Sequence, residues 1–335
     1  MANRYWVGGT AAWDGTAGTK WALTSGGAGG QAIPTSADDV FLDASSGANT
    51  VTISTGNTGA KSLTCTGFTG TLAGSANITV SGSVTLASTM THTYSGILTI
   101  NATGTLTTAG KTCAGVSLSA AGGTITLGDA FTTSLNFLIT TGTVNTNNFN
   151  VTAVGIGSAY SSARTFALGS SLITLTGTAG ANIGATNLTV TGTATIKFTN
   201  ASSKNFDSNY AFTNITIDQG GAGAIVFVGS NTFNDITNSY SATGATTLTF
   251  TSGTTTTLSQ FTATGAVGKV LTLGASTTSQ AILRKSSTWY MGANSTDGGN
   301  NTGLTFTAGG GIDYLSVSYI NGAGIASTGN FLMFF

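Results

Sequence analysis

The chain has 335 residues, of which 49 are glycine and about a fifth are threonine, and ten lysine or arginine residues balance ten acidic residues. Every acidic residue is aspartate. Long helices depend on residues such as Glu, Lys, Leu and Ala, so this composition excludes a helical or α/β domain. The chain has no basic cluster that could neutralise phosphates, which excludes nucleic-acid binding. No apolar run approaches the roughly 18 residues of a membrane span, so we expect none.

The first 45 residues differ from the rest of the chain. They contain three of the four tryptophans, Trp6, Trp13 and Trp21, and the only proline, Pro34. The end of a stack of strands exposes core residues and unpaired strand edges, and large indoles cover much apolar area. We therefore predict a Trp-rich N-terminal cap over residues 1–45. The first residues lack the apolar core of a signal peptide, so we expect no signal peptide.

Residues 46–285 repeat a short unit of an apolar residue, a threonine and an apolar residue, followed by Gly, Ser or Asn. Examples are 51–53, 78–80, 84–86, 98–100, 125–127, 188–190, 215–217 and 248–250. Alternation with a period of two predicts half-buried strands, with threonine on the outward side. Strand starts six to eight residues apart imply coils of about 20 to 26 residues, which is typical of solenoids. We predict an all-β fold, a single-stranded parallel β-solenoid (β-helix) of about 13 to 15 coils.

Residues 286–335 are predicted to hold further coils, a loop and an apolar tail. Trp289 and Tyr290 are candidates for stacking on a carbohydrate ring, or for anchoring the loop that follows them. In that loop only Asp297 is charged, so it is a weak calcium candidate and we expect no metal site. Five exposed apolar residues would form a patch typical of an interface. These are Phe331, Leu332, Met333, Phe334 and Phe335. This apolar tail indicates a homo-oligomer, with a trimer favoured, in which the tails of several chains bury one another. The alternative is that the tail folds back and covers the last coil of its own chain.

The densest group of carboxylates is Asp38, Asp39 and Asp43. Glycoside cleavage needs two carboxylates at a fixed separation, but we favour a turn in which aspartate accepts backbone hydrogen bonds. His92 lies in a predicted strand without the cysteine cluster or activated serine that zinc or triad chemistry needs. We therefore expect a solvent-facing histidine and no catalytic residues.

Three further residues have a structural interpretation. Cys65 and Cys113 lack metal-ligand spacing, and we expect buried thiols, with a bridge as the less favoured alternative. Arg164 follows a long excursion over 155–162 that should form a projecting loop. We expect Arg164 to tie this loop to backbone carbonyls rather than to bind an anion.

Several segments carry a resemblance to a known family. They are Tyr5–Gly9, Trp13–Asp14, Trp21, Pro34–Phe41, Gly142–Thr152, Arg164–Ser171, Phe233–Ile236, Leu248–Thr255 and Trp289–Gly303. Together they resemble the Gly/Thr-rich β-helix virion proteins of tailed bacteriophages, which are tail-fibre-like or surface-decoration proteins. The resemblance implies a structural component of the particle, assembled in the host cytoplasm, and it supplies no catalytic residues.

We therefore expect a non-enzymatic structural protein of a phage particle, a fibre or surface decoration without a cofactor. Its expected partners are further copies of itself, other virion proteins and a host surface glycan. The main alternative is a bacterial cell-surface adhesin or extracellular filament protein. A polysaccharide-degrading tailspike and an ice-binding solenoid are less favoured. Ice binding needs one uninterrupted threonine face, whereas here the threonine spacing drifts and aromatic residues interrupt it.

Overall fold

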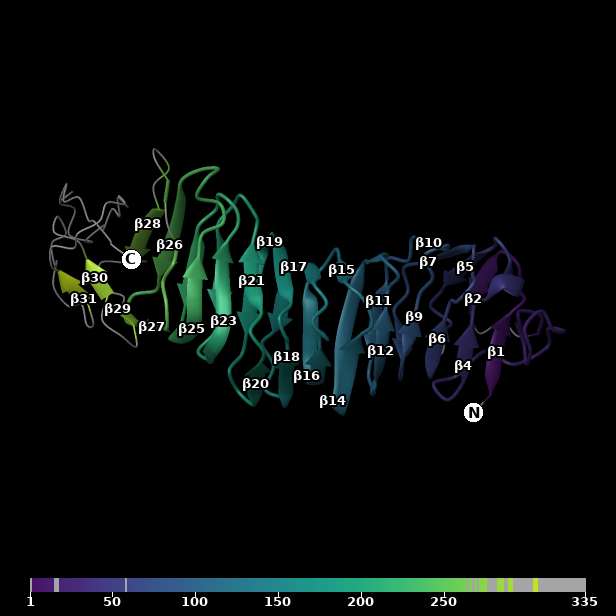
Figure 1. Ribbon diagram of the computed structural model, residues 1–335. Helices are drawn as coiled ribbons and strands as arrows, with labels where there is room; N and C mark the ends of the chain where they lie inside the picture. The colour runs from purple at the N-terminus through teal and green to yellow at the C-terminus, as the bar shows by residue number, and fades with distance from the viewer. Residues whose placement is uncertain are drawn as a thin grey trace. The chain divides into compact units, whose positions relative to one another are not determined.

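The computed structural model describes residues 2–14, 18–57, 59–263, 265, 266, 269, 271–275, 282–285, 289–291 and 304–306. Nearly all of the regular structure in these residues is β-strand, with one short 3-10 turn, η1 (Ala44–Ser46). The strands stack as parallel coils in a β-solenoid of about 11 turns (Figure 1). The predicted all-β, parallel solenoid is confirmed.

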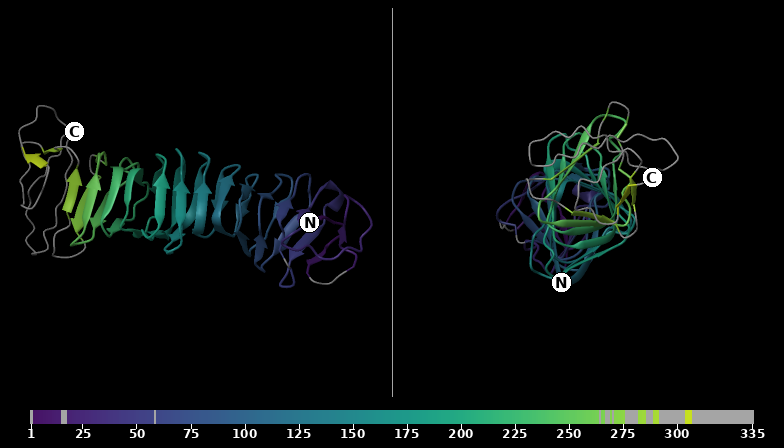
Figure 2. Two further views of the ribbon diagram at one scale, coloured as in Figure 1. Left: turned by 90° about the horizontal axis from the view of Figure 1, so that it is seen from below. Right: turned by 90° about the vertical axis from the view of Figure 1, so that its left-hand side faces the viewer.

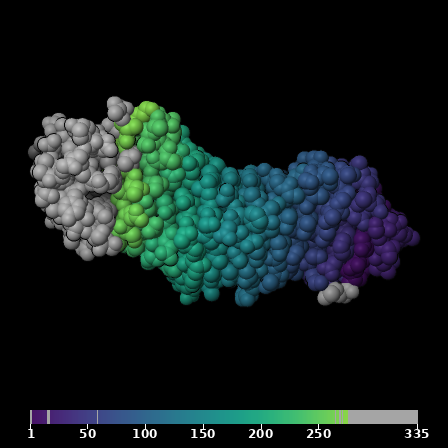
Figure 3. All heavy atoms as spheres, in the orientation of Figure 1, coloured from purple at the N-terminus to yellow at the C-terminus, as the bar shows by residue number. Residues whose placement is uncertain are grey.

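The chain divides into two compact units. Unit 1 comprises Met1–Ser171 and Thr186–Thr191, and unit 2 comprises Leu172–Ala185 and Gly192–Phe335. Figure 2 gives two further views of the stacked strands. Figure 3 shows one face of the molecule with all heavy atoms drawn as spheres.

Most strands of unit 1 are short. They are β1 (Asn3–Trp6), β2 (Ala11–Trp13), β3 (Trp21–Ala22), β4 (Asp39–Phe41), β5 (Thr50–Ile53), β6 (Ser62–Thr64), β7 (Thr71–Gly74), β8 (Ile78–Val80), β9 (Val84–Thr85), β10 (Thr91–His92), β11 (Ile97–Ile100), β12 (Gly104–Thr107), β13 (Thr112–Cys113), β14 (Gly115–Leu127), β15 (Phe131–Thr133), β16 (Phe137–Asn145), β17 (Val151–Ser158), β18 (Arg164–Ala167) and β20 (Leu188–Thr191).

Unit 2 contains the remaining strands. They are β19 (Leu172–Ile183), β21 (Thr195–Phe198), β22 (Lys204–Asp207), β23 (Ala211–Gln219), β24 (Ile225–Val228), β25 (Asn231–Thr237), β26 (Thr246–Phe250), β27 (Thr255–Leu258), β28 (Leu271–Ala275), β29 (Ile282–Lys285), β30 (Trp289–Met291) and β31 (Leu304–Phe306).

The register of unit 1 places like residues above one another. A buried column on one inward face consists of Val40, Leu63, Val84, Leu106 and Leu127. Each of these residues pairs with its counterpart on the next coil. Burying such a side chain contributes about 1.5 to 3 kcal/mol relative to leaving it exposed, so these columns supply the main stabilisation of the stack.

The first turn of the solenoid is longer than the others. A hydrogen bond from Ala2 N to Asp38 Oδ1 joins residues 36 apart, whereas Ser158 bonds to Ile139 across 19 residues. The described residues form about 11 turns, and the long first turn accounts for part of the difference from the 13 to 15 coils predicted for the whole chain.

Some strands are longer than the predicted three-residue unit because they continue round a corner. The first half of β14 pairs with β11 and its second half pairs with β12, with a register irregularity between Leu118 and Thr124. At this corner Gly122 has φ +69°, which glycine adopts without steric cost. Likewise, β17 runs to Ser158, so only residues 159–162 of the predicted excursion lie in a loop, which spans 159–163.

The tryptophans of the N-terminal region form one buried cluster. Trp6, Trp13 and Trp21 are each at most 2% exposed. The Trp21 ring meets those of Trp6 and Trp13 edge-on, at centroid distances of 5.0 and 5.1 Å. Strand β1 pairs in parallel with β4 on one side and antiparallel with β3 on the other. The short strand β3 therefore covers the edge of the first parallel strand.

The core of unit 2 is rich in phenylalanine. Phe227 stacks on Phe250 of the next coil at 5.0 Å, and Phe212 stacks on Phe233 at 5.8 Å. Phe206 lies edge-on to Phe212 and Phe233. Such aromatic pairs add about 0.5 to 1.5 kcal/mol beyond the area that they bury.

Candidate functional site

The three aspartates of residues 38–43 have separate structural partners. Asp38 is buried and accepts hydrogen bonds from Ala2 N, Thr35 N and Thr35 Oγ1. Burial alone would raise the pKa of its carboxyl, but these hydrogen bonds and Arg4 outweigh it and lower the pKa. Asp39 contacts Lys61 Nζ at 3.1 Å, and Asp43 caps η1. This arrangement fits a turn better than a catalytic pair of carboxylates.

Other aspartates link one coil to the next. Asp129 accepts hydrogen bonds from Thr108 N and Ala109 N at 2.8 and 2.5 Å, about one coil away along the chain. Asp235 accepts hydrogen bonds from Thr262 N and Oγ1 at 3.0 and 2.6 Å. These carboxylates act as inter-coil links, because each satisfies donors on a neighbouring turn.

One triangle of side chains in unit 2 has the residue types of a serine–lysine dyad. Lys197 Nζ donates to Ser239 Oγ at 2.8 Å and lies 3.3 Å from Asp218 Oδ2. The Ser239 hydroxyl donates to Asp218 Oδ2 at 2.7 Å. A lysine that activates serine must be neutral. Here the lysine is ion-paired with Asp218, and the same carboxylate accepts the serine hydrogen bond, so this triangle is another inter-coil link.

Arg164 is buried, with 1% of its surface exposed. Its Nη2 donates to Thr186 O at 2.7 Å, its Nε donates to Ser162 O at 3.1 Å, and its Nη1 donates to Ser158 O. Burial lowers the pKa of the guanidinium. The prediction that Arg164 ties a loop to backbone carbonyls is confirmed.

Lys204 is a second buried cation, and it was not among the residues predicted from the sequence. Its side chain is 1% exposed, and its Nζ donates to the carbonyls of Asn200, at 3.0 Å, and Gly223. Burial lowers its pKa to about 8. The period of two gave one signal for this burial, because it places Lys204 on the same face of β22 as the buried Phe206.

The histidine and the cysteines do not form a reactive site among the described residues. His92 is half-buried rather than fully solvent-facing, with Nδ1 3.1 Å from Thr112 O. Burial lowers its pKa, as does Lys111, and the Thr112 carbonyl acts in the opposite direction. Cys65 and Cys113 are buried free thiols, as expected. Burial raises the pKa of both to about 12, which disfavours the reactive thiolate.

Threonines align on one outward face of unit 1. The column in register on four successive coils consists of Thr124, Thr143, Thr165 and Thr189. The adjoining column reads Thr126, Asn145, Ala167 and Thr191. Two neighbouring, unbroken threonine columns are therefore not present on this face, and the ladder does not supply the regular lattice that ice binding needs.

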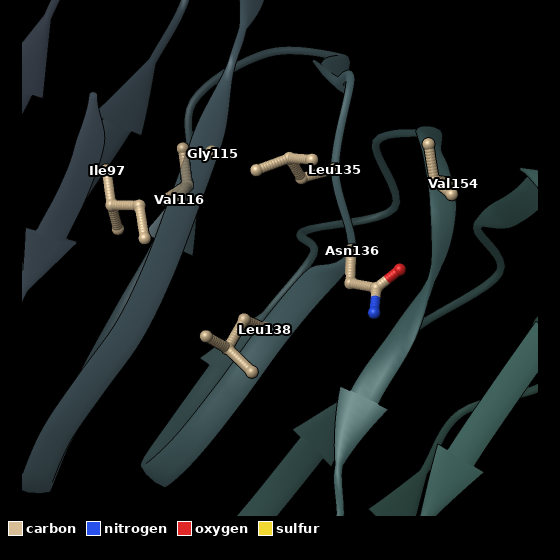
Figure 4. Close-up of a pocket in the computed structure, with 7 residues that line it drawn as sticks. All are labelled: Ile97, Gly115, Val116, Leu135, Asn136, Leu138 and Val154. Carbon is tan, nitrogen blue, oxygen red and sulfur yellow. The ribbon is translucent and has the colours of Figure 1, made fainter. Parts of the chain in front are cut away.

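An apolar groove of about 270 Å³ lies on another outward face of unit 1 (Figure 4). Ile97 and Leu135 flank Gly115, whose missing side chain makes room for them. Val116, Leu138 and Val154 complete the apolar lining, with Asn136 as a polar member. The sequence held one signal for this groove, since Phe137, Leu138 and Ile139 break the period of two and force an apolar residue outward.

The C-terminal candidates lie largely outside the described residues. Trp289 and Tyr290 belong to β30, which pairs in parallel with β31. Asp297 and residues 331–335 lie outside the described part of the chain, so their predicted roles remain predictions.

The described residues contain no group of three His, Cys, Asp or Glu side chains that could hold a metal ion. Within the same residues, no helix is long and apolar enough to cross a membrane. Comparison with family models, with curated proteins and with solved structures finds no match for this chain.

Proposed function

We propose that this protein is a non-enzymatic structural component of a bacteriophage particle, a fibre or surface decoration that contacts the host surface. One structural observation carries the non-enzymatic part of this proposal. Asp129, Asp218, Asp235 and the buried cations Arg164 and Lys204 all hydrogen-bond to neighbouring segments of the coil. Their polar atoms serve the scaffold, whereas a catalytic acid or nucleophile is directed at a substrate.

The virion context rests on the resemblance of the sequence to phage β-helix proteins. The fold is compatible with this context, because each coil adds about 4.8 Å to a stack that needs no closed globular core. Threonine, serine and asparagine on the outward faces present hydroxyl and amide groups without net charge.

Antibody labelling of particles purified from the source culture tests the proposal. We expect electron microscopy to place the label on the particle surface or tail. Label confined to cell envelopes would contradict the proposal and support the adhesin alternative. In a companion assay we expect no depolymerisation of host capsular polysaccharide, and release of new reducing ends would support the tailspike alternative.

We also propose that the chain assembles as a homo-oligomer, with a trimer favoured, through the apolar residues 331–335. Light scattering should give the mass of a trimer for the full chain and of a monomer for a chain ending at Asn330. Monomers of equal stability in both cases would contradict this assignment of the interface.

A further inference from the structure

Two exposed segments of unit 1 meet at one place on the coil. The first is the loop of residues 159–163 between β17 and β18, and the second is Thr186 and Asn187, just before β20. Asn187 Nδ2 donates to Ser161 O at 2.9 Å, and Asn187 O accepts a hydrogen bond from Arg164 N at 2.9 Å. We refer to residues 159–163, 186 and 187 as the pinned loop pair.

The guanidinium of Arg164 fixes both segments from the inside. One nitrogen donates to a carbonyl of the first segment, at Ser162, and another donates to a carbonyl of the second, at Thr186. The planar guanidinium holds its donors in a fixed geometry, so these bonds restrict how the two segments move relative to each other. A surface that is ordered before its partner arrives loses less conformational entropy on binding.

The pinned loop pair presents an aromatic ring to solvent. The large apolar side chains that are exposed among the described residues are Leu23, Ile97, Leu135, Tyr160 and Leu172, so Tyr160 is the aromatic member of this set. It is 41% exposed. Exposed Ser161, Ser162, Thr186 and Asn187 lie in the same pair of segments. Tyrosine with serine and asparagine is the composition of recognition loops, in which the ring supplies rigid contact area and the small polar groups supply adaptable hydrogen bonds.

The absence of charged side chains on the pinned loop pair favours an uncharged partner. The exposed residues of the pinned loop pair are all uncharged, and the cation that supports them donates to backbone carbonyls inside the fold. An anionic polymer would find no compensating charge here. A neutral sugar offers an apolar C–H face that stacks on a tyrosine ring and hydroxyl groups that bond to serine, threonine and asparagine.

We propose that the pinned loop pair binds a neutral glycan, with the Tyr160 ring as its stacking platform. This inference rests on the proposed function, in which the host surface supplies that glycan. It assigns the contact to unit 1, independently of the predicted roles of Trp289 and Tyr290.

Binding of the purified full chain to an array of neutral and acidic bacterial surface polysaccharides tests this inference. We expect the protein to bind at least one neutral polysaccharide and Tyr160→Ala to weaken that binding about tenfold or more. Tyr160→Phe keeps the ring and should stay within about threefold of the unchanged protein. Leu23→Ala, which removes an exposed side chain elsewhere in unit 1, is the matched control and should leave binding unchanged.

Equal binding by the unchanged protein and Tyr160→Ala would overturn the inference. So would binding confined to acidic polysaccharides, no binding to any polysaccharide, or binding to an envelope protein alone. Antibody label on particles together with any of these results would leave the proposed function standing. Glycan binding that depends on Tyr160, without label on particles, would instead overturn the virion assignment alone.

Discussion

A lysine removed from water loses hydration that backbone carbonyls replace only in part, and Lys204 is in this position. Burial lowers its pKa to about 8 in the folded chain, whereas an unfolded lysine titrates near 10.4, about its ordinary value. Between these two values the unfolded chain binds more protons than the folded chain. The contribution of Lys204 to the free energy of unfolding therefore rises with pH in this window, and below about pH 8 its destabilising effect is complete.

Denaturant unfolding of the unchanged protein and of Lys204→Met tests this prediction. The thiols of Cys65 and Cys113 act in the opposite direction, because their pKa values are raised to about 12 on folding. Because both proteins contain these thiols, their contribution cancels when the stability of the variant is subtracted from that of the unchanged protein. We expect the stability of the unchanged protein to rise relative to the variant between about pH 8 and pH 10.4. If the difference in unfolding free energy between the two proteins stays constant across this pH window, the assigned burial of the Lys204 ammonium is contradicted.

The N-terminal tryptophans should contribute strongly to stability. Trp13→Ala or Trp21→Ala should lower the free energy of unfolding by about 3 to 5 kcal/mol, since each indole is buried in the same cluster. Aggregation should increase as well, because the uncovered end exposes strand edges. Thermal and urea unfolding measure the loss, with Leu23→Ala at a 51% exposed position as the control. Unchanged melting of the tryptophan variants would show that the indoles do not support the core.

Within the strands and their corners, the distance between a glycine and the backbone of the next coil determines whether alanine can replace that glycine. Gly142 in β16 and Gly122 in β14 both have positive φ, of +82° and +69°. A Cβ at Gly142 would lie 1.8 Å from Ala120 O, whereas one at Gly122 would meet nothing within 4 Å. An alanine at either position would therefore have a strained backbone, but only an alanine at Gly142 would also clash with the neighbouring coil.

We expect Gly122→Ala to cost about 1 to 2 kcal/mol, the usual cost of a left-handed alanine. Gly142→Ala should cost about 4 kcal/mol or more, because the neighbouring backbone must move. Urea unfolding of the two variants measures both effects. Equal losses would show that the coils are not packed as closely as the register implies.

The period-two pattern located most strands because it follows directly from burial of alternate side chains. Residues 78–80 and 248–250 fall within β8 and β26 as expected. What the pattern lacks is information on how the chain turns between faces. The continuation of β14 round the corner at Gly122 and the backbone carbonyls that receive Lys204 depend on that turn. The role of a site residue was predictable where its residue type has one common structural role, as for Arg164. It was not predictable where side chains on adjacent coils determine the surroundings of the residue.

Across the whole chain trypsin has few sites, because the sequence contains only ten lysine and arginine residues. Lys204 is buried in β22, Lys197 in β21 pairs with Asp218, and Lys269 Nζ donates to Ala242 O. Native protein should therefore resist trypsin at all three sites, whereas urea-unfolded protein should be cut there. Time-resolved mass spectrometry of the digest reads the sites. Rapid cleavage of native protein after Lys197 or Lys204 would mean that these strands open readily.

We propose that this solenoid is built into a phage particle as a structural protein. Quantitative mass spectrometry of density-purified particles from the source culture tests it most directly. We predict that the chain is present in a fixed number of copies relative to the major capsid protein, and that this ratio persists through repeated purification. Absence of the chain from such particles, or a ratio that falls with each round of purification, would contradict the claim.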